Sequence, residues 1–163
     1  MSKPFLFLSN NPMLEEKYRK NKHIAVAFLP AADFRDVIAQ AGKYVEEGYH
    51  LMTHPLASNL KPMQCPYKSI LLSSAREAFA KERDLEMIRL SLEKVDALTK
   101  GMTSPKWNEK TLLDFQTIDL SVVDSAVQSS LFRQMVENPY LTVWGCSLTV
   151  LSPATIHAGE STL

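Results

Sequence analysis

Four short apolar runs follow one another along the first half of the chain, and polar residues or proline end each of them. They occupy positions 5–8, 24–29, 51–53 and 69–72. Polar residues do not alternate with apolar ones inside these runs, as they would in a strand with one face in water. The pattern therefore predicts short strands that are covered on both faces, which is typical of a parallel sheet.

Helical periodicity appears between and after the predicted strands. The clearest helix runs from Asp33 to Glu47, where apolar residues three and four positions apart form one face. Asp33 is expected to cap its start, and Gly48 to supply the left-handed residue that ends it. Further helices are expected over 13–20 after Asn11, from an Asp84 cap to Gly101, and onward from an Asn108 cap.

Strands that alternate with helices predict a three-layer α/β domain with right-handed crossovers. We expect a Rossmann-like or flavodoxin-like domain whose sheet is mostly parallel and has about four to five strands. The connection over 53–69 does not fit this scheme, since it is rich in proline and too short for a crossover helix with its turns. This connection suggests either an active or binding loop, or an antiparallel edge strand.

The composition of the chain changes near position 120, because Arg133 is the only Lys or Arg beyond it. We therefore expect an α/β domain over 1–124 and a C-terminal extension over 125–163. The extension begins with a segment that could continue a helix, at 125–137, and then contains two strand-like segments, at 140–144 and 148–151. These two segments could form a hairpin, an edge strand or an apolar interface.

Charge and targeting signals narrow the functional class. Lys and Arg number 18 and Asp and Glu also number 18, so the formal net charge is zero. This balance argues against a general nucleic-acid binder and against electrostatic attachment to a membrane. The apolar run at 5–8 is shorter than a signal-peptide core, and Cys65 and Cys146 do not form a CxxC pair. We therefore expect a cytoplasmic protein with reduced thiols.

Common cofactor and metal motifs do not occur in the sequence. The five glycines are too far apart for a GxGxxG or P-loop phosphate cradle, and neither GxSxG nor HExxH is present. His50 and His54 are four residues apart, but Gly48 ends the preceding helix and Pro55 follows at once. In an extended segment such residues lie roughly 13 Å apart, too far to share a metal ion. No cofactor and no metal site is expected.

Ligands of open parallel sheets bind beyond the carboxyl ends of the strands, and polar residues stand at those ends here. Asn11 and the unsatisfied N–H groups of the helix behind it could hold an anion. Lys61 could neutralise a carboxylate or phosphate, and His54, the one candidate catalytic residue, could act as a general acid or base. The predicted ligand-binding residues are Ser9, Asn10, Asn11, Thr53, His54, Ser58, Lys61, Tyr67 and Lys68, with Ser73 and Ser74 expected nearby.

The same residues also permit an explanation without a ligand. An Asn-Asn-Pro sequence starts a helix well on its own, and Pro55, Pro62 and Pro66 could simply stiffen a long loop. Cys65 has no neighbouring His or basic pair that would activate its thiol, so an unreactive cysteine is expected there.

Five segments of the chain form a recognisable series. They are Ser9–Pro12, His50–Leu56, Lys61–Pro62, Pro66–Ile70 and Asp114–Leu120, and the likeness runs in order from about Phe5 to Val123. Together they resemble the GrdX proteins, small proteins encoded with the glycine, sarcosine and betaine reductase systems of anaerobic amino-acid-fermenting bacteria. The resemblance implies an accessory component without an established reaction. The chain has no selenocysteine and no paired redox thiols, so a catalytic reductase subunit is not expected.

These observations support three hypotheses. The first is a cytoplasmic accessory protein of amino-acid reductase metabolism, which binds a small anionic metabolite or a reductase component at the strand ends. The second is a small enzyme that uses His54 as general acid or base. The third is a structural or assembly protein whose C-terminal tail forms an interface, for example in a homo-oligomer.

Overall fold

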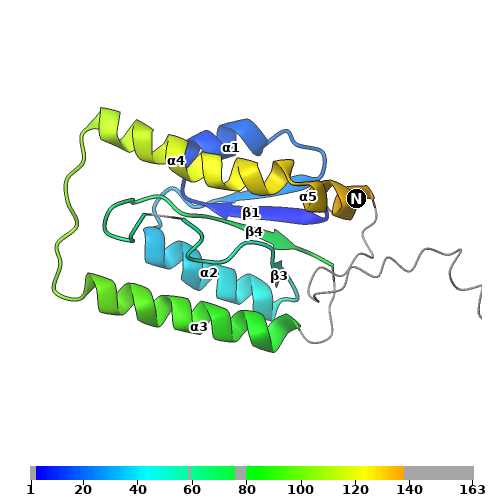
Figure 1. The fold of residues 1–163 in the computed structure, drawn as a ribbon, viewed down its shortest axis with the longest axis horizontal. Coiled ribbons are helices and arrows are strands. Elements are labelled where there is room, and N and C mark those ends of the chain that lie inside the picture. The colour runs from blue at the N-terminus through cyan, green and yellow to red at the C-terminus, as the bar shows by residue number, and fades with distance from the viewer. Residues whose placement is uncertain (1–2, 59, 76–79, 138–163) are drawn as a thin grey trace, which may run out of the picture.

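The computed structural model describes residues 3–58, 60–75 and 80–137. In these ranges, four strands form one sheet and helices cover both of its faces (Figure 1). The strands are β1 (Phe5–Ser9), β2 (Ile24–Phe28), β3 (His50–Leu51) and β4 (Ser69–Ser73). The helices are α1 (Pro12–Tyr18), α2 (Phe34–Glu46), α3 (Ala80–Thr99), α4 (Glu109–Gln128) and α5 (Ser130–Glu137).

The sheet is mixed rather than mostly parallel. Its strand order is β2-β1-β4-β3, and only β1 and β2 form a parallel pair. Strand β4 is antiparallel to both neighbours, so that Ser69 lies opposite Ser9 and Leu72 lies opposite Leu51. The predicted Rossmann-like or flavodoxin-like sheet is therefore wrong.

The error has a physical cause in the connection between β3 and β4. Apolar runs indicate that a strand is covered on both faces, and they do not indicate its direction. The described residues of 52–68 contain no helix on which the chain could cross back to begin another parallel strand, so β4 returns in the opposite direction. The open alternative of an antiparallel edge strand is right about the direction of β4 and wrong about its place, because β4 lies inside the sheet between β1 and β3.

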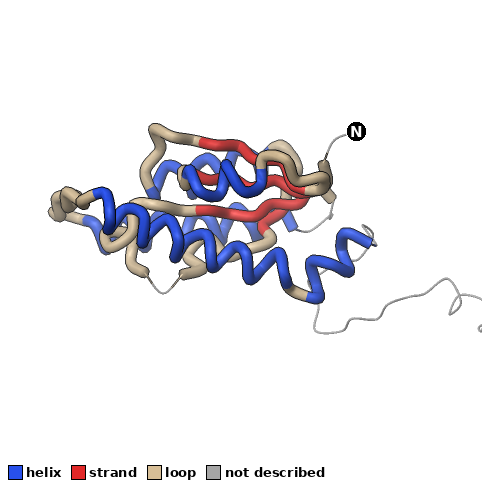
Figure 2. The backbone as a smooth tube through the Cα atoms, turned by 90° about the horizontal axis from the view of Figure 1, so that it is seen from above, coloured by secondary structure: helices blue, strands red, loops and turns tan. Residues whose placement is uncertain are grey.

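Two apolar layers flank the sheet. Leu8 and Leu72 point toward α2 and α3, in one cluster of buried side chains. Phe7 and Leu71 point to the other face, in a second cluster with residues of α1, α4 and α5. Figure 2 shows α4 running along the sheet and a short break before α5. Among the described helices, none has both the length and the apolar character that a membrane crossing requires.

Three of the predicted helix starts are confirmed. Asp33 caps α2 in a reciprocal capping box with Asp36, Asn11 caps α1, and Asn108 caps α4. Gly48 follows α2 with a φ of 108°, a conformation that favours glycine.

The predicted cap at Asp84 is wrong. This residue lies inside α3, its side chain is buried, and its Oδ2 accepts a hydrogen bond of 2.9 Å from the backbone N–H of Leu51. Since β3 is the edge strand, its outward N–H has no neighbouring strand to pair with. Asp84 satisfies that donor instead.

The predicted boundary at position 124 falls within α4, which continues to Gln128 and is followed by α5. Helix α5 packs against β1, and the ring centroids of Phe132 and Phe5 are 4.6 Å apart. The strand-like segments predicted at 140–144 and 148–151 lie outside the described residues.

Candidate functional site

Six polar side chains gather where β1 ends and β4 begins, and we call them the buried polar cluster. All six are between 0% and 8% exposed. Strand β1 and the turn after it contribute three of them, the start of β4 contributes two, and α4 contributes one. They are Ser9, Asn10, Asn11, Lys68, Ser69 and Asp119.

A directed chain of hydrogen bonds links four members of the cluster. The backbone N–H of Asn11 donates to Ser9 Oγ at 2.9 Å, and the hydroxyls of Ser9 and Ser69 are 2.6 Å apart. Ser69 Oγ then donates to Asp119 Oδ2 at 2.6 Å, and Asn11 Nδ2 donates to the same oxygen at 2.9 Å. Because Ser69 gives its hydrogen to Asp119, the Ser9 hydroxyl must donate to Ser69. Such a chain of donors polarises its members and strengthens each bond.

The side-chain amides of Asn10 and Asn11 form hydrogen bonds mainly with the backbone of the protein. Asn10 Nδ2 donates to the carbonyl oxygens of Ala32 and Pro66, and its Oδ1 accepts from the backbone N–H of Lys68. This side chain therefore ties the end of β1 to two separate loops. Both amide hydrogens are engaged, so Asn10 has none left to donate to a ligand.

Asn11 is equally occupied. Its Nδ2 donates to the Gln116 carbonyl oxygen and to Asp119, while its Oδ1 accepts from the Met13 N–H at the start of α1. The Asn11 side chain, predicted to help hold an anion, therefore already bonds to the carboxyl group of Asp119 from α4. Helix α4 covers this end of α1.

Lys68 carries the least expected charge in the cluster. Its side chain is 2% exposed, yet in the described ranges no carboxylate lies within 4.0 Å of its Nζ. The Nζ donates to the Ala57 carbonyl oxygen at 3.3 Å and lies 5.5 Å from the centre of the Phe34 ring. Burial lowers the pKa of Lys68 to about 8, and the nearby charge of Asp119 opposes this shift.

Burial acts on Asp119 in the opposite direction. It raises the pKa of this carboxyl group, and the hydrogen bonds from Ser69 and Asn11 and the charge of Lys68 reduce the shift. Each of the two buried groups is thus disfavoured in its charged form, and each lessens that cost for the other.

A small enclosed space, which we call the inner cavity, lies between Lys68 and Asp119. Its volume is about 10 Å³, measured as the space open to the centre of a water molecule. That is room for about one water. Burial raises the pKa of the Cys65 thiol to about 11, so this lining residue is not an activated nucleophile. The lining residues are Phe34, Ser58, Leu60, Cys65, Tyr67, Lys68, Ile118 and Asp119.

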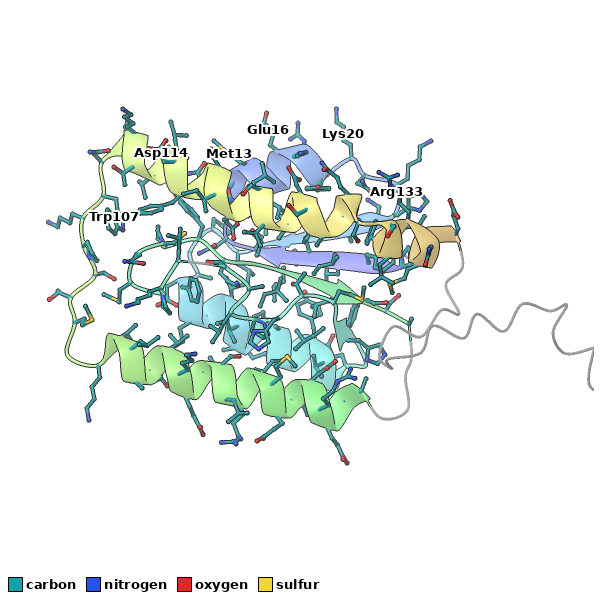
Figure 3. All side chains as sticks on the ribbon, viewed as in Figure 1. Met13, Glu16, Lys20, Trp107, Asp114 and Arg133 are labelled. Atoms are coloured by element: carbon teal, nitrogen blue, oxygen red, sulfur yellow. The ribbon has the colours of Figure 1, made fainter. Side chains whose placement is uncertain are left out.

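A larger space, the outer cleft, has a volume of about 450 Å³ and also lies at the end of the sheet where β1 ends and β4 begins. The end of β1, the segment 30–35, the loop 62–67, the end of α3 and the segment 102–112 line it. The linker between α3 and α4 passes this end of the molecule, where Figure 3 labels Trp107.

Two aromatic side chains separate the outer cleft from the inner cavity. Phe34 and Tyr67 line both spaces. Phe34 is 6% exposed and belongs to the core beside α2, whereas Tyr67 is only half-buried. Gln116 Nε2 donates to the Tyr67 hydroxyl at 2.9 Å. Tyr67 therefore stands between solvent and Lys68.

The structure brings together six of the nine predicted ligand-binding residues. Ser9, Asn10, Asn11 and Lys68 belong to the buried polar cluster, and Ser58 and Tyr67 line the inner cavity beside it. Tyr67 and Lys68 lie near the end of β1 because β4 is antiparallel to β1 and therefore begins where β1 ends.

The other three predicted residues lie elsewhere. Thr53 Oγ1 accepts from the Leu71 N–H between β3 and β4, and Lys61 is exposed and lines neither space. His54 lines a separate groove along α3, where partial burial, Lys68 and Lys94 lower its pKa. The expectation for Ser73 and Ser74 is wrong, since β4 ends at the opposite edge and Ser74 bonds to the Pro4 carbonyl oxygen there.

Several residues of the site are missing from the predicted ligand-binding set, although Gln116 and Asp119 lie in the segment Asp114–Leu120 that carries the family resemblance. Asp119 and Gln116 are three positions apart on α4 and so face the same side of that helix. A buried acidic residue on an otherwise apolar helix face was the available signal for Asp119. Nothing in the spacing of Phe34 or Cys65 indicates that they meet Lys68. In the described part of the chain, no three His, Cys, Asp or Glu side chains form a metal-binding group.

The pKa of Lys68 leads to a prediction about stability and pH. Between about pH 8 and its ordinary pKa of 10.5, the folded chain has lost the proton that the unfolded chain still holds on Lys68. Stability attributable to this residue therefore rises with pH in that window. From pH 8 to 10, the free energy of unfolding of the wild type should rise relative to Lys68→Met by about 2 kcal/mol.

Urea unfolding at a series of pH values measures this difference. Lys61→Met removes an exposed lysine from the preceding loop and is the matched control, which should follow the wild-type curve. Parallel curves for the wild type and Lys68→Met would show that burial does not depress the pKa of Lys68.

Comparison with known protein families finds a match for this chain. A family model described as GrdX-like protein matches residues 6–128. No curated protein and no solved structure matches the chain. The matched range runs from β1 to the end of α4 and contains the whole buried polar cluster. The match covers most of the 163 residues, so the chain belongs to the GrdX-like family.

Proposed function

We propose that this chain is a cytoplasmic accessory protein of the glycine, sarcosine or betaine reductase systems. We further propose that it binds a small anionic ligand next to Lys68, where β1 ends and β4 begins. Family membership supports the link to these reductases. The burial of Lys68 and Asp119 supports a small ligand rather than a reductase component as the partner of this site, because a protein surface could not reach these two side chains.

The observation that carries the proposal is the buried ammonium of Lys68. Removing an ammonium from water costs several kcal/mol unless an opposite charge and good hydrogen bonds replace the water. Lys68 has one hydrogen bond of 3.3 Å to a carbonyl oxygen, and Asp119 is more than 4.0 Å away and already bonded to Ser69 and Asn11. A bound anion would supply the missing partner.

The outer cleft supports the same proposal by its position and size. It holds about 450 Å³ and ends at Tyr67, immediately in front of the inner cavity. Small-molecule sites are typically concave, largely apolar and provided with a few polar groups. The lining combines apolar side chains with polar and charged ones, among them Asp33 and Arg35. Behind Tyr67, an entering anion would reach Lys68, the buried lysine of the described residues.

Calorimetric titration with acetate and with inorganic phosphate tests this function. Lys68→Met should weaken the binding of the better probe by at least about tenfold, because a charge-assisted contact is lost. Lys61→Met, which removes an exposed lysine, should leave the affinity within about twofold. Lys68→Gln provides a second uncharged side chain, and circular dichroism confirms that each variant is folded.

Two results would contradict the proposal. One is that neither anion binds the wild-type chain. The other is that folded Lys68→Met or Lys68→Gln binds the anion as well as the wild type does.

A further inference from the structure

Lys68 is not the only charged group at the inner cavity. Asp119 lines the same space, is 8% exposed, and belongs to another element of the fold. A simple anion placed against Lys68 would also approach the Asp119 carboxylate, and this repulsion would offset part of the attraction. A molecule with a negative and a positive group could instead pair with both side chains.

We propose that Lys68 and Asp119 recognise the two charges of a small zwitterion with a carboxylate and a cationic amine. Tyr67 is the gate: its movement merges the inner cavity with the outer cleft, and the widened space takes the ligand. This inference rests on the proposed function and narrows its ligand to one whose anionic carboxylate is accompanied by a cationic amine. The carboxylate pairs with Lys68, and the amine pairs with Asp119.

The gate follows from the dimensions of the two spaces. The inner cavity, at about 10 Å³, admits a water and no larger molecule, while the outer cleft beside it holds about 450 Å³. A molecule larger than water therefore reaches Lys68 and Asp119 only if a wall of the inner cavity moves. Phe34 is buried in the core, but Tyr67 is half-buried and its hydroxyl is held by one side chain, Gln116.

The walls also suit the amine end of such a ligand. Aromatic rings attract ammonium groups through the negative face of the ring. The Phe34 ring already has the Lys68 ammonium at 5.5 Å, which leaves the Tyr67 ring as the surface that an entering amine meets. Asp119 Oδ2 accepts from Ser69 and Asn11, and a carboxylate with two oxygens retains capacity for a further donor.

Calorimetry with three probes tests the ligand class. Glycine is the smallest molecule that carries both charges, and acetate and methylamine each carry one of them. Glycine should bind the wild type at least about tenfold more tightly than either single-charge probe. Asp119→Asn retains an oxygen that can accept from Ser69 and Asn11, and it should remove the advantage of glycine over acetate. Asp114→Asn, an exposed position on the same helix, is the matched control and should retain that advantage.

The outcomes separate this inference from the proposed function. If acetate binds as tightly as glycine in a Lys68-dependent way, the zwitterion is wrong and the anion site remains. If Asp119→Asn is folded and still binds glycine more tightly than acetate by the wild-type factor, Asp119 does not bind the amine of the ligand. If no probe binds, both proposals fail.

The gate has a test that needs no ligand. In a Cys146→Ser chain, Cys65 is the only thiol and lines the inner cavity, so its alkylation by iodoacetamide reports access to that cavity. Tyr67→Ala should speed alkylation at least about tenfold. Tyr49→Ala removes a tyrosine that contacts Tyr44 edge-on and does not line the cavity, so it should not change the rate. An unchanged rate in Tyr67→Ala would overturn the gate.

Discussion

Replacing Asp119 with alanine should lower the free energy of unfolding by about 3 kcal/mol. The substitution removes the acceptor shared by Ser69 Oγ and Asn11 Nδ2, and both donors are buried without another partner of equal strength. It also removes the negative charge that favours the buried ammonium of Lys68. Relief of the buried carboxyl group itself offsets part of this loss, since burial raises its pKa.

Chemical denaturation at pH 7 measures the effect, and two further variants identify its cause. Asp119→Asn keeps an acceptor oxygen and should cost clearly less than alanine. Asp114→Ala, at the exposed position that Figure 3 labels on α4, should stay within about 0.5 kcal/mol of the wild type. Equal stability of Asp119→Ala and Asp114→Ala would mean that the hydrogen-bond chain does not hold α4 to the sheet.

Replacing Phe7 with alanine should be at least as damaging, at about 3–5 kcal/mol. Phe7 is 0% exposed at the centre of β1. Its ring contacts the ring of Tyr18 edge-on at 4.9 Å between centroids, and it shares a cluster with Leu14 of α1 and Val123 of α4. Alanine would leave a cavity that side chains from three different elements cannot fill together.

Thermal and urea unfolding would measure this loss. Phe7→Leu keeps most of the volume and should cost much less than alanine. Leu113→Ala truncates a side chain of α4 that is 51% exposed, and it should have little effect. A Phe7→Ala cost no larger than that of Leu113→Ala would contradict the packing of α1 and α4 against β1.

The occupied amides change how the site should be probed. An anion site built on Asn10 and Asn11 would predict that their alanine variants lose binding and keep their stability. In the structure, Asn10 joins β1 to two loops and Asn11 joins α1 to α4. Substitutions at these two positions would therefore disturb the fold first. Lys68 and Tyr67 are the more direct probes of binding.

Part of the fold and the site follows from local sequence. Continuous apolar runs predict the buried strands β1 and β4, because every side chain of such a strand must avoid water whichever face it occupies. The same signal predicts β2 as a strand but not its exposure, since β2 is an outer strand and only Ile24 of it is buried. Asp33, Asn11 and Asn108 predict helix starts, because a cap depends on residues within one turn. The same local signals place polar residues at the ends of the strands.

Strand direction and side-chain partners depend on contacts that no local pattern contains. The antiparallel course of β4 brings Tyr67 and Lys68 to the end of β1 and carries Ser73 and Ser74 away from it. The packing of α4 brings Asp119 to within hydrogen-bonding distance of Ser69, 50 positions earlier in the chain. The sequence by itself determined which segments are buried and where helices begin, since those properties arise from neighbouring residues. Only the tertiary structure decided that a lysine and an aspartate face one enclosed space, since that requires three distant segments to fold together.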